Sequence, residues 1–253
     1  MLQEMLQLNI FAFMMVFARI GTAMLIMPGF SAVQVYARHR LSLALAISFL
    51  ATPALVSQMP AVPGEPMMIF VLIGAEILAG AILGTVPLIL IASVHVAGTL
   101  ISYISGLASA LTWDPVVQGQ SGIVSGFLGM VALVAVFVTD MHHVFLRAIL
   151  DSYTLFHPGI APDIGDATQM LTRHVAQSFL IGVQMSTPFI IANFAYNVGL
   201  GIMTRLAPQI PIFFVAMPLQ LIASLALMMV TTSGVILALL NFMGENMRPF
   251  LLQ

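Results

Sequence analysis

The sequence predicts an all-α integral membrane protein with six to seven helical segments, some of them broken. Its 253 residues are 60% hydrophobic and only 6% charged, and the mean hydropathy is +1.09. A soluble domain carries about 25% charged residues, so this chain cannot cover itself with a surface suited to water. Long apolar runs alternate with short turn segments, and no stretch has the alternating pattern of a half-buried strand.

The first two apolar segments cover residues 8–28 and 41–56. Segment 8–28 lacks the basic start of a signal peptide, because Glu4 precedes it and Arg19 lies inside it. We therefore interpret it as a retained first helix. Pro28-Gly29 ends the first segment, and the proline-rich stretch 60–66 ends the second.

The third apolar segment, residues 67–105, exceeds the ~20 residues that cross the hydrocarbon of a bilayer. Pro87 lies near its middle and predicts a kink or a tight hairpin there. The remaining segments are separated by turn residues around 106–122, 157–166 and 207–211, and they cover 122–150, 174–200 and 211–243.

The charge and cysteine content exclude several classes of protein. The net charge of −2 favours neither nucleic acid nor an acidic partner, and the absence of cysteine excludes disulfides. Lysine is also absent, so the formal cations are seven arginines. With 67–105 taken as one segment, the loop arginines divide three against three, which leaves the membrane orientation open.

Two ionisable residues, Arg19 and Glu76, fall deep inside apolar segments. An unpaired charge at that depth costs a few kcal/mol or more, so each needs a partner. They could pair with each other or with a neighbouring chain. A structural role is favoured over an ion path, because Glu76 is the one acid deep in a segment.

Segment 174–200 is unusually polar, since it carries Gln184, Asn193 and Asn197 among its apolar residues. An amide facing lipid would be left without a hydrogen bond at a cost of several kcal/mol. We therefore expect these amides to contact other subunits. Two glycine pairs with GxxxG spacing, 80/84 and 122/126, predict close helix packing inside the chain.

The cluster Asp140, His142 and His143 raises the question of a metal site. Asp140 and His143 would share a helix face, but His142 would point elsewhere, and no second cluster completes a tetrahedral set. A polar segment boundary or a subunit contact is the favoured interpretation. No catalytic triad, nucleotide loop or carboxylate pair is visible, so we expect no enzyme activity, metal or cofactor.

In their order along the chain, these motifs resemble the FliR family of flagellar export-gate proteins, whose injectisome counterpart is SctT. The resemblance covers essentially the whole chain, and one departure is Pro211, where the family usually has Asn. The matching features are Phe17-Ala18-Arg19, Arg38, Arg40, Glu76, Gly80, Gly84, Gly98, Gly106-Leu107, Asp114-Pro115-Val116, Asp140-Met141-His142-His143, Ser152, Pro158, Pro188, Asn197, Gly199-Leu200 and the stretch from Arg205 to Phe213.

The resemblance implies a core subunit of a type III protein export gate. Such a subunit joins FliP-like and FliQ-like chains, FlhB wraps the entrance, FlhA supplies the export platform, and unfolded flagellar proteins pass through. The fold would be a FliP-like part, about residues 1–200, followed by a FliQ-like part, about 201–253. The gate would lie in the bacterial inner membrane at the flagellar basal body, with much of it towards the periplasm.

The resemblance also gives a role to the segment 106–122, which would be the plug that closes the pore. Glycines permit sharp turns, Pro115 stiffens the chain, and Trp113 offers a large apolar side chain to fill a lumen. The plug residues are Gly106, Leu107, Trp113, Asp114, Pro115, Val116, Gln118 and Gly119.

A second segment is expected to be a sharp break between two helices, because two prolines lie close together in it. Its residues are Arg205, Pro208, Gln209, Pro211 and Phe213. Two other functions stay open at this point: a small-solute secondary transporter, and an intramembrane metalloenzyme built on the cluster at 140–143.

Overall fold

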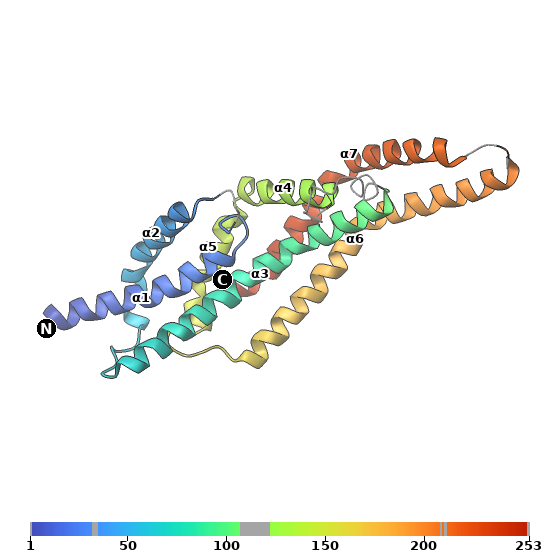
Figure 1. Ribbon diagram of the computed structural model, residues 1–253. Helices are drawn as coiled ribbons and strands as arrows, with labels where there is room; N and C mark the ends of the chain where they lie inside the picture. Colours follow the sequence, from blue (N-terminus) through green and yellow to red (C-terminus); the bar gives the residue numbers. More distant parts are fainter. Residues whose placement is uncertain (1, 32–34, 107–121, 208, 210–211, 252–253) are drawn as a thin grey trace. The chain divides into compact units, whose positions relative to one another are not determined.

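The structure is a computed structural model that describes residues 2–31, 35–106, 122–207, 209 and 212–251. These residues form seven α-helices and two short 3-10 helices, without a strand among them (Figure 1). The expected all-α fold is thereby confirmed. The elements are α1 (Leu2–Ile26), α2 (Ala37–Leu55), η1 (Val56–Gln58), α3 (Pro66–Ile104), α4 (Ile123–Val138), α5 (Met141–Leu155), α6 (Ile164–Leu206), α7 (Ile212–Met247) and η3 (Arg248–Phe250).

By length and composition, four of the described helices can cross a membrane, or up to five if α4 and α5 together form one broken span. The hairpin expected as one alternative at Pro87 is wrong, because α3 continues through this proline for 39 residues. The apolar segment 122–150 is instead divided in two. Asp140, in the left-handed conformation with φ 57°, separates α4 from α5.

The chain forms two compact units. The first contains residues 1–90, 136–175 and 243–253, and the second contains 91–135 and 176–242. The chain passes from one unit to the other inside α3, α4, α6 and α7. The expected division into FliP-like and FliQ-like parts near residue 200 falls inside α6, and that division stays a prediction.

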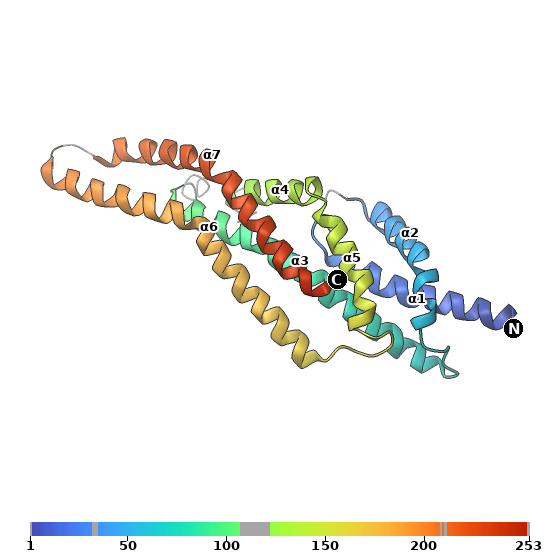
Figure 2. The same ribbon diagram turned by 180° about the vertical axis from the view of Figure 1, so that it is seen from behind.

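In the first unit α1 lies alongside α3, as both views of the chain show (Figures 1 and 2). The buried residues of α1 recur every three or four positions, so one stripe of this helix faces the core. Two glycines of α3 allow the close approach. A Cβ on Gly80 would lie 2.3 Å from the carbonyl oxygen of Arg19, and one on Gly84 would lie 2.6 Å from that of Ala23. This contact has the packing geometry expected of GxxxG spacing inside one chain.

The second glycine pair behaves differently. A Cβ on Gly122 would lie 2.5 Å from the Ser102 hydroxyl oxygen, whereas one on Gly126 would have nothing within 4 Å. Close packing in the second unit instead involves Gly98 of α3, where a Cβ would lie 2.4 Å from Cα of Ser125 on α4. Of the two glycines in this pair, Gly122 is closely packed as the spacing predicts, and Gly126 is not.

The second unit leaves much of its surface uncovered along α6 and α7. Among the described residues, no side chain is buried from 190 to 206 of α6 or from 217 to 234 of α7. We call these two stretches the exposed hairpin. In the most apolar 18-residue stretch of each helix, the buried share is 6% for α7 and 61% for α3. The hairpin therefore needs lipid or other subunits to cover its apolar side chains.

Candidate functional site

The site rests on a buried ion pair between α1 and α3. Arg19 lies on the buried stripe of α1, and Glu76 lies one helical turn before Gly80 on α3; both residues are fully buried. Arg19 Nε donates to Glu76 Oε2 at 2.6 Å, and Nη2 donates to Oε1 at 3.1 Å. Of the alternatives left open by the sequence, the structure shows the two residues paired with each other. Two parallel bonds make this a charge-assisted, bidentate contact.

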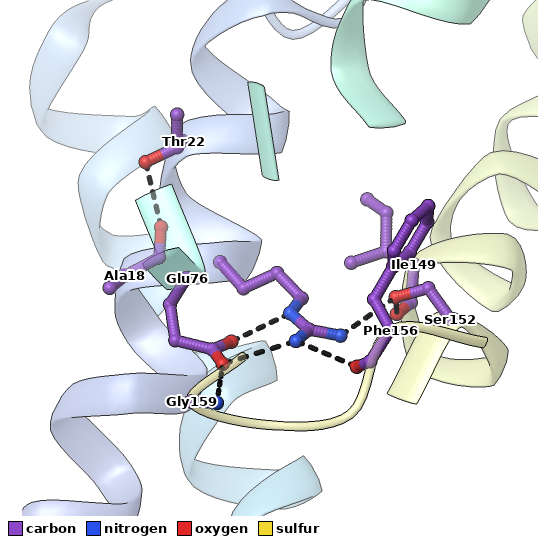
Figure 3. Close-up of polar contacts among 8 residues, drawn as sticks. Ala18, Thr22, Glu76, Ile149, Ser152, Phe156 and Gly159 are labelled. Carbon is purple, nitrogen blue, oxygen red and sulfur yellow. Dashed lines mark hydrogen bonds and ion pairs between the residues drawn. The ribbon is translucent and has the colours of Figure 1, made fainter. Parts of the chain in front are cut away.

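The remaining hydrogen-bonding groups of the pair are used by α5 and the turn after it (Figure 3). Arg19 also donates to the Ser152 hydroxyl oxygen at 3.3 Å and to the Phe156 carbonyl oxygen at 3.0 Å. The backbone N–H of Gly159 donates to Glu76 Oε1 at 3.0 Å. Gly159 has φ 80°, in the left-handed region that favours glycine. The pair thus joins three segments that are far apart in the sequence.

An aromatic ring covers the guanidinium group. Tyr153 of α5 is 1% exposed, and the centre of its ring lies 3.9 Å from Cζ of Arg19. A cation over an aromatic face is attracted by the ring quadrupole, most strongly where water is excluded. The Tyr153 hydroxyl has no hydrogen-bond partner among the residues that the structure describes. The ring therefore contributes through its face and its packing.

We call Arg19, Glu76, Ser152, Tyr153, Phe156 and Gly159 the Arg19 cluster. One cation balances one anion in it, so the cluster buries no net charge. The guanidinium group has five N–H donors, and it makes four hydrogen bonds within the cluster. Such a group suits a structural joint between helices better than proton transfer. Sequence analysis identified the two charges but missed Tyr153 and Gly159, for which the sequence carries no local signal.

The amides of α6 have unequal surroundings in the second unit. Asn193 is half-buried, and its side-chain oxygen accepts a hydrogen bond from Gln220 Nε2 on α7 at 3.2 Å. The same nitrogen of Gln220 donates to the Ile104 carbonyl oxygen at 3.2 Å, at the end of α3. Asn193 therefore has a partner within its own chain. Gln220 was missed, although it is the single amide between residues 212 and 240.

Two other amides stay at the surface. Gln184 and Asn197 are exposed, and Asn197 Nδ2 donates to the Asn193 carbonyl oxygen of its own helix at 2.8 Å. Tyr196 adds a second link across the hairpin, because its hydroxyl donates to the Ala216 carbonyl oxygen of α7. The exposed amides remain candidates for contact with other subunits.

The cluster at 140–143 lies in the first unit, at the start of α5. The expectation that His142 would point elsewhere is wrong, because one ligand atom from each of Asp140, His142 and His143 lies within 4.8 Å of the others. Asp140 precedes the helix in the left-handed conformation, so the spacing rule for helix faces does not apply to it. Asp140 Oδ1 and His143 Nδ1 are 3.3 Å apart.

The described contacts of these three side chains account for their closeness without a cation. The imidazole rings of His142 and His143 are tilted by 37° to each other with their centres 4.0 Å apart, and the His142 ring lies 4.9 Å from the Phe137 ring. These contacts favour a polar boundary between α4 and α5 in which the rings pack together.

The two expected special segments lie partly outside the described residues. Of the plug residues the structure describes Gly106, which has φ 74°, whereas 107–121 lie outside. At the expected break, α6 ends at Leu206 and α7 begins at Ile212, so no helix continues across this stretch. Arg205 is exposed in the last turn of α6, Gln209 is in a turn, and Pro208 and Pro211 lie outside the described residues. Phe213 belongs to the first turn of α7.

Residues 10–246 match the family described as bacterial export proteins, family 1. The chain belongs to this export family. A member from Caulobacter vibrioides, a flagellar biosynthetic protein FliR, is 35% identical over 221 residues, which cover 87% of this chain and 88% of the relative. The FliR of Bacillus subtilis is 28% identical, with 95% and 94% covered. A Yop proteins translocation protein T from Yersinia pestis is 29% identical, with 69% and 68% covered.

The resemblance inferred from the motifs is confirmed by membership of the export family. The matched range contains the whole Arg19 cluster, both helical stretches of the exposed hairpin and the segment 106–122. The features described above are therefore features of an export-family domain and not of an added segment.

Proposed function

We propose that this chain is a non-enzymatic core subunit of the type III export gate of the bacterial flagellum, placed in the inner membrane at the basal body. The observation that carries the proposal is the family match over residues 10–246, together with relatives named for flagellar biosynthesis and Yop translocation. In the proposed gate, FliP-like and FliQ-like chains join the subunit, FlhB wraps the entrance, FlhA supplies the export platform, and exported flagellar proteins pass through. Much of the gate lies towards the periplasm.

The exposed hairpin supports a place among other subunits. Its outward side chains include large apolar residues, such as Phe194 at 71% and Met229 at 83% exposure. The same surface carries the exposed amide of Asn197. An amide that faces lipid lacks hydrogen-bond partners, whereas a neighbouring protein chain can supply them. A surface that combines both kinds of side chain is better suited to helices of other subunits than to lipid alone.

Copurification tests the proposed place in a gate. We expect native mass spectrometry of the tagged chain, extracted from its own membrane in mild detergent, to show complexes with FliP-like and FliQ-like proteins. Expressed without them, the chain should aggregate or be degraded, because the exposed hairpin stays uncovered. A monodisperse single chain that transports small solutes after reconstitution would contradict the proposal and favour a secondary transporter.

We also propose that the segment 106–122 closes the pore of this gate. Its described ends support the idea. Gly106 follows the last turn of α3. Gly122, at the other end of the segment, packs against that last turn, because a Cβ on it would lie 2.5 Å from the Ser102 hydroxyl oxygen. The two ends of the segment therefore lie close together. A segment that only linked α3 to α4 would not need its present length, since the ends already meet.

Deleting residues 110–119 separates a plug from a connector. Loop-closure entropy changes slowly with length, so a shortened connector would alter neither assembly nor permeability. A plug adds bulk that matters only while the pore is closed. We expect normal amounts of complex and a severalfold increase in small-solute permeability, with Trp113→Ala giving a smaller increase. Permeability is measured in intact cells and normalised to complex abundance. Unchanged permeability at equal abundance would contradict a plug.

A further inference from the structure

An apolar groove in the first unit lies between α1, α2 and α3, away from the Arg19 cluster's polar groups. Its volume is about 520 Å³. The lining is aliphatic or aromatic apart from Arg40 and Thr22, and the Thr22 hydroxyl already donates to the Ala18 carbonyl oxygen. The residues that matter most below are Phe13, Gly21 and Leu25 of α1 and Arg40 of α2. We call this the α1–α2 groove.

The length of the groove corresponds to one leaflet of a bilayer. Its lining on α1 runs from Phe13 to Leu25, a rise of about 18 Å at 1.5 Å per residue. One leaflet contributes about 15 Å of the ~30 Å hydrocarbon thickness. α2 runs back along α1 (Figure 1). Arg40 is in the first turn of α2 and Leu25 in the last turn of α1, so Arg40 belongs to the Leu25 end of the groove.

Positive charge gathers at that end of the groove. Arg38 and His39 are exposed beside Arg40, in the first turn of a helix that is long and apolar enough to span a membrane. Among the described residues, neither Arg38 nor Arg40 forms an ion pair, and no acidic side chain lines the groove. A basic residue at the end of a span lies at the level of the lipid headgroups.

We infer that the α1–α2 groove binds one acyl chain of an anionic phospholipid, whose headgroup phosphate is held by Arg40. Basic pockets between membrane helices recognise anionic headgroups, and each buried methylene adds to the affinity. The apolar lining would contribute nothing to the binding of free phosphate. The inference does not depend on the proposed role in export.

The shape and lining of the groove suit a single extended hydrocarbon chain as the occupant. Its volume of about 520 Å³ is lined almost wholly by apolar side chains, with Arg40 as the one charged group among the described lining residues.

The test uses native mass spectrometry of the full chain in the assembly extracted from its membrane, with added phosphatidylglycerol or phosphatidylcholine. We expect tighter binding of phosphatidylglycerol. Arg40→Gln should reduce that preference about fivefold, the ratio that corresponds to the ~1 kcal/mol of one arginine near an anionic lipid surface. Arg173→Gln, an exposed arginine outside the groove lining, should leave the preference unchanged.

A second pair of variants tests the acyl chain. Gly21→Leu should fill the groove and weaken binding of both lipids, because its Cβ would meet nothing closer than the Phe17 ring at 3.6 Å. Gly74→Leu, where a Cβ has nothing within 4 Å, is the matched control outside the groove. Equal affinity of the unmodified assembly for the two lipids would overturn the inference. Unchanged phosphatidylglycerol binding in Gly21→Leu would also overturn it. So would the absence of lipid binding by the unmodified assembly.

Discussion

Arg19→Leu and Glu76→Leu should each remove most of the assembled protein from the membrane. Either change leaves one buried charge without its partner, and the cost of such a loss is about 3–5 kcal/mol. A folded domain has a total stability of about 5–15 kcal/mol, so this loss is a large fraction of it. Arg19→Leu additionally leaves the Ser152 hydroxyl and the Phe156 carbonyl oxygen with one contact fewer.

The double variant Arg19→Leu/Glu76→Leu distinguishes an unpaired charge from a general packing defect. It removes both charges, so we expect it to recover part of the lost protein, although the Gly159 N–H then loses its acceptor. Arg147→Leu is the control, because its contact with Asp151 spans 3.8 Å and the arginine side chain is 72% exposed. The measurement is the abundance of the chain and of its complexes in membranes. Normal abundance in both single variants would contradict a structural role.

Gly80→Ala should destabilise the first unit, although alanine is the better helix former. The new methyl group would lie 2.3 Å from the Arg19 carbonyl oxygen, more than an ångström inside the 3.4 Å at which ordinary contact begins. A backbone atom cannot rotate away, so α1 and α3 must separate. Overpacking typically costs about 1–3 kcal/mol, and contact with backbone places this change at the upper end. Separation also pulls Arg19 from Glu76, one turn earlier on α3.

Gly74→Ala is the matched control for that variant, because a Cβ there has nothing within 4 Å. Replacing glycine by alanine inside a helix contributes up to ~1 kcal/mol, so Gly74→Ala should be neutral or slightly stabilising. The readout is the thermal unfolding midpoint in detergent together with complex abundance. If the two alanine variants unfold at the same temperature, the close approach of α1 and α3 at Gly80 is not what stabilises the unit.

Much of this protein's character is determined by the sequence alone. The scarcity of charge and the length of the apolar runs require helices in a membrane, because unpaired backbone groups are too costly there. The two ionisable residues deep in apolar segments, Arg19 and Glu76, could be identified for the same reason. The ordered motifs also indicated the export family before any fold was known.

Other features were decided by the tertiary structure. Pro87 does not divide α3. Proline lacks a backbone N–H, but a helix packed among others can find another donor for the carbonyl group left without one. No local sequence pattern predicts that packing. The same holds for the partners of Arg19. Tyr153 lies 134 positions after Arg19, and Gly159 lies 83 positions after Glu76. Only the packing of α5 and the turn after it against α1 and α3 brings them to the guanidinium and the carboxylate. Sequence periodicity predicts which face of a helix is buried, but it does not specify which distant helix covers that face.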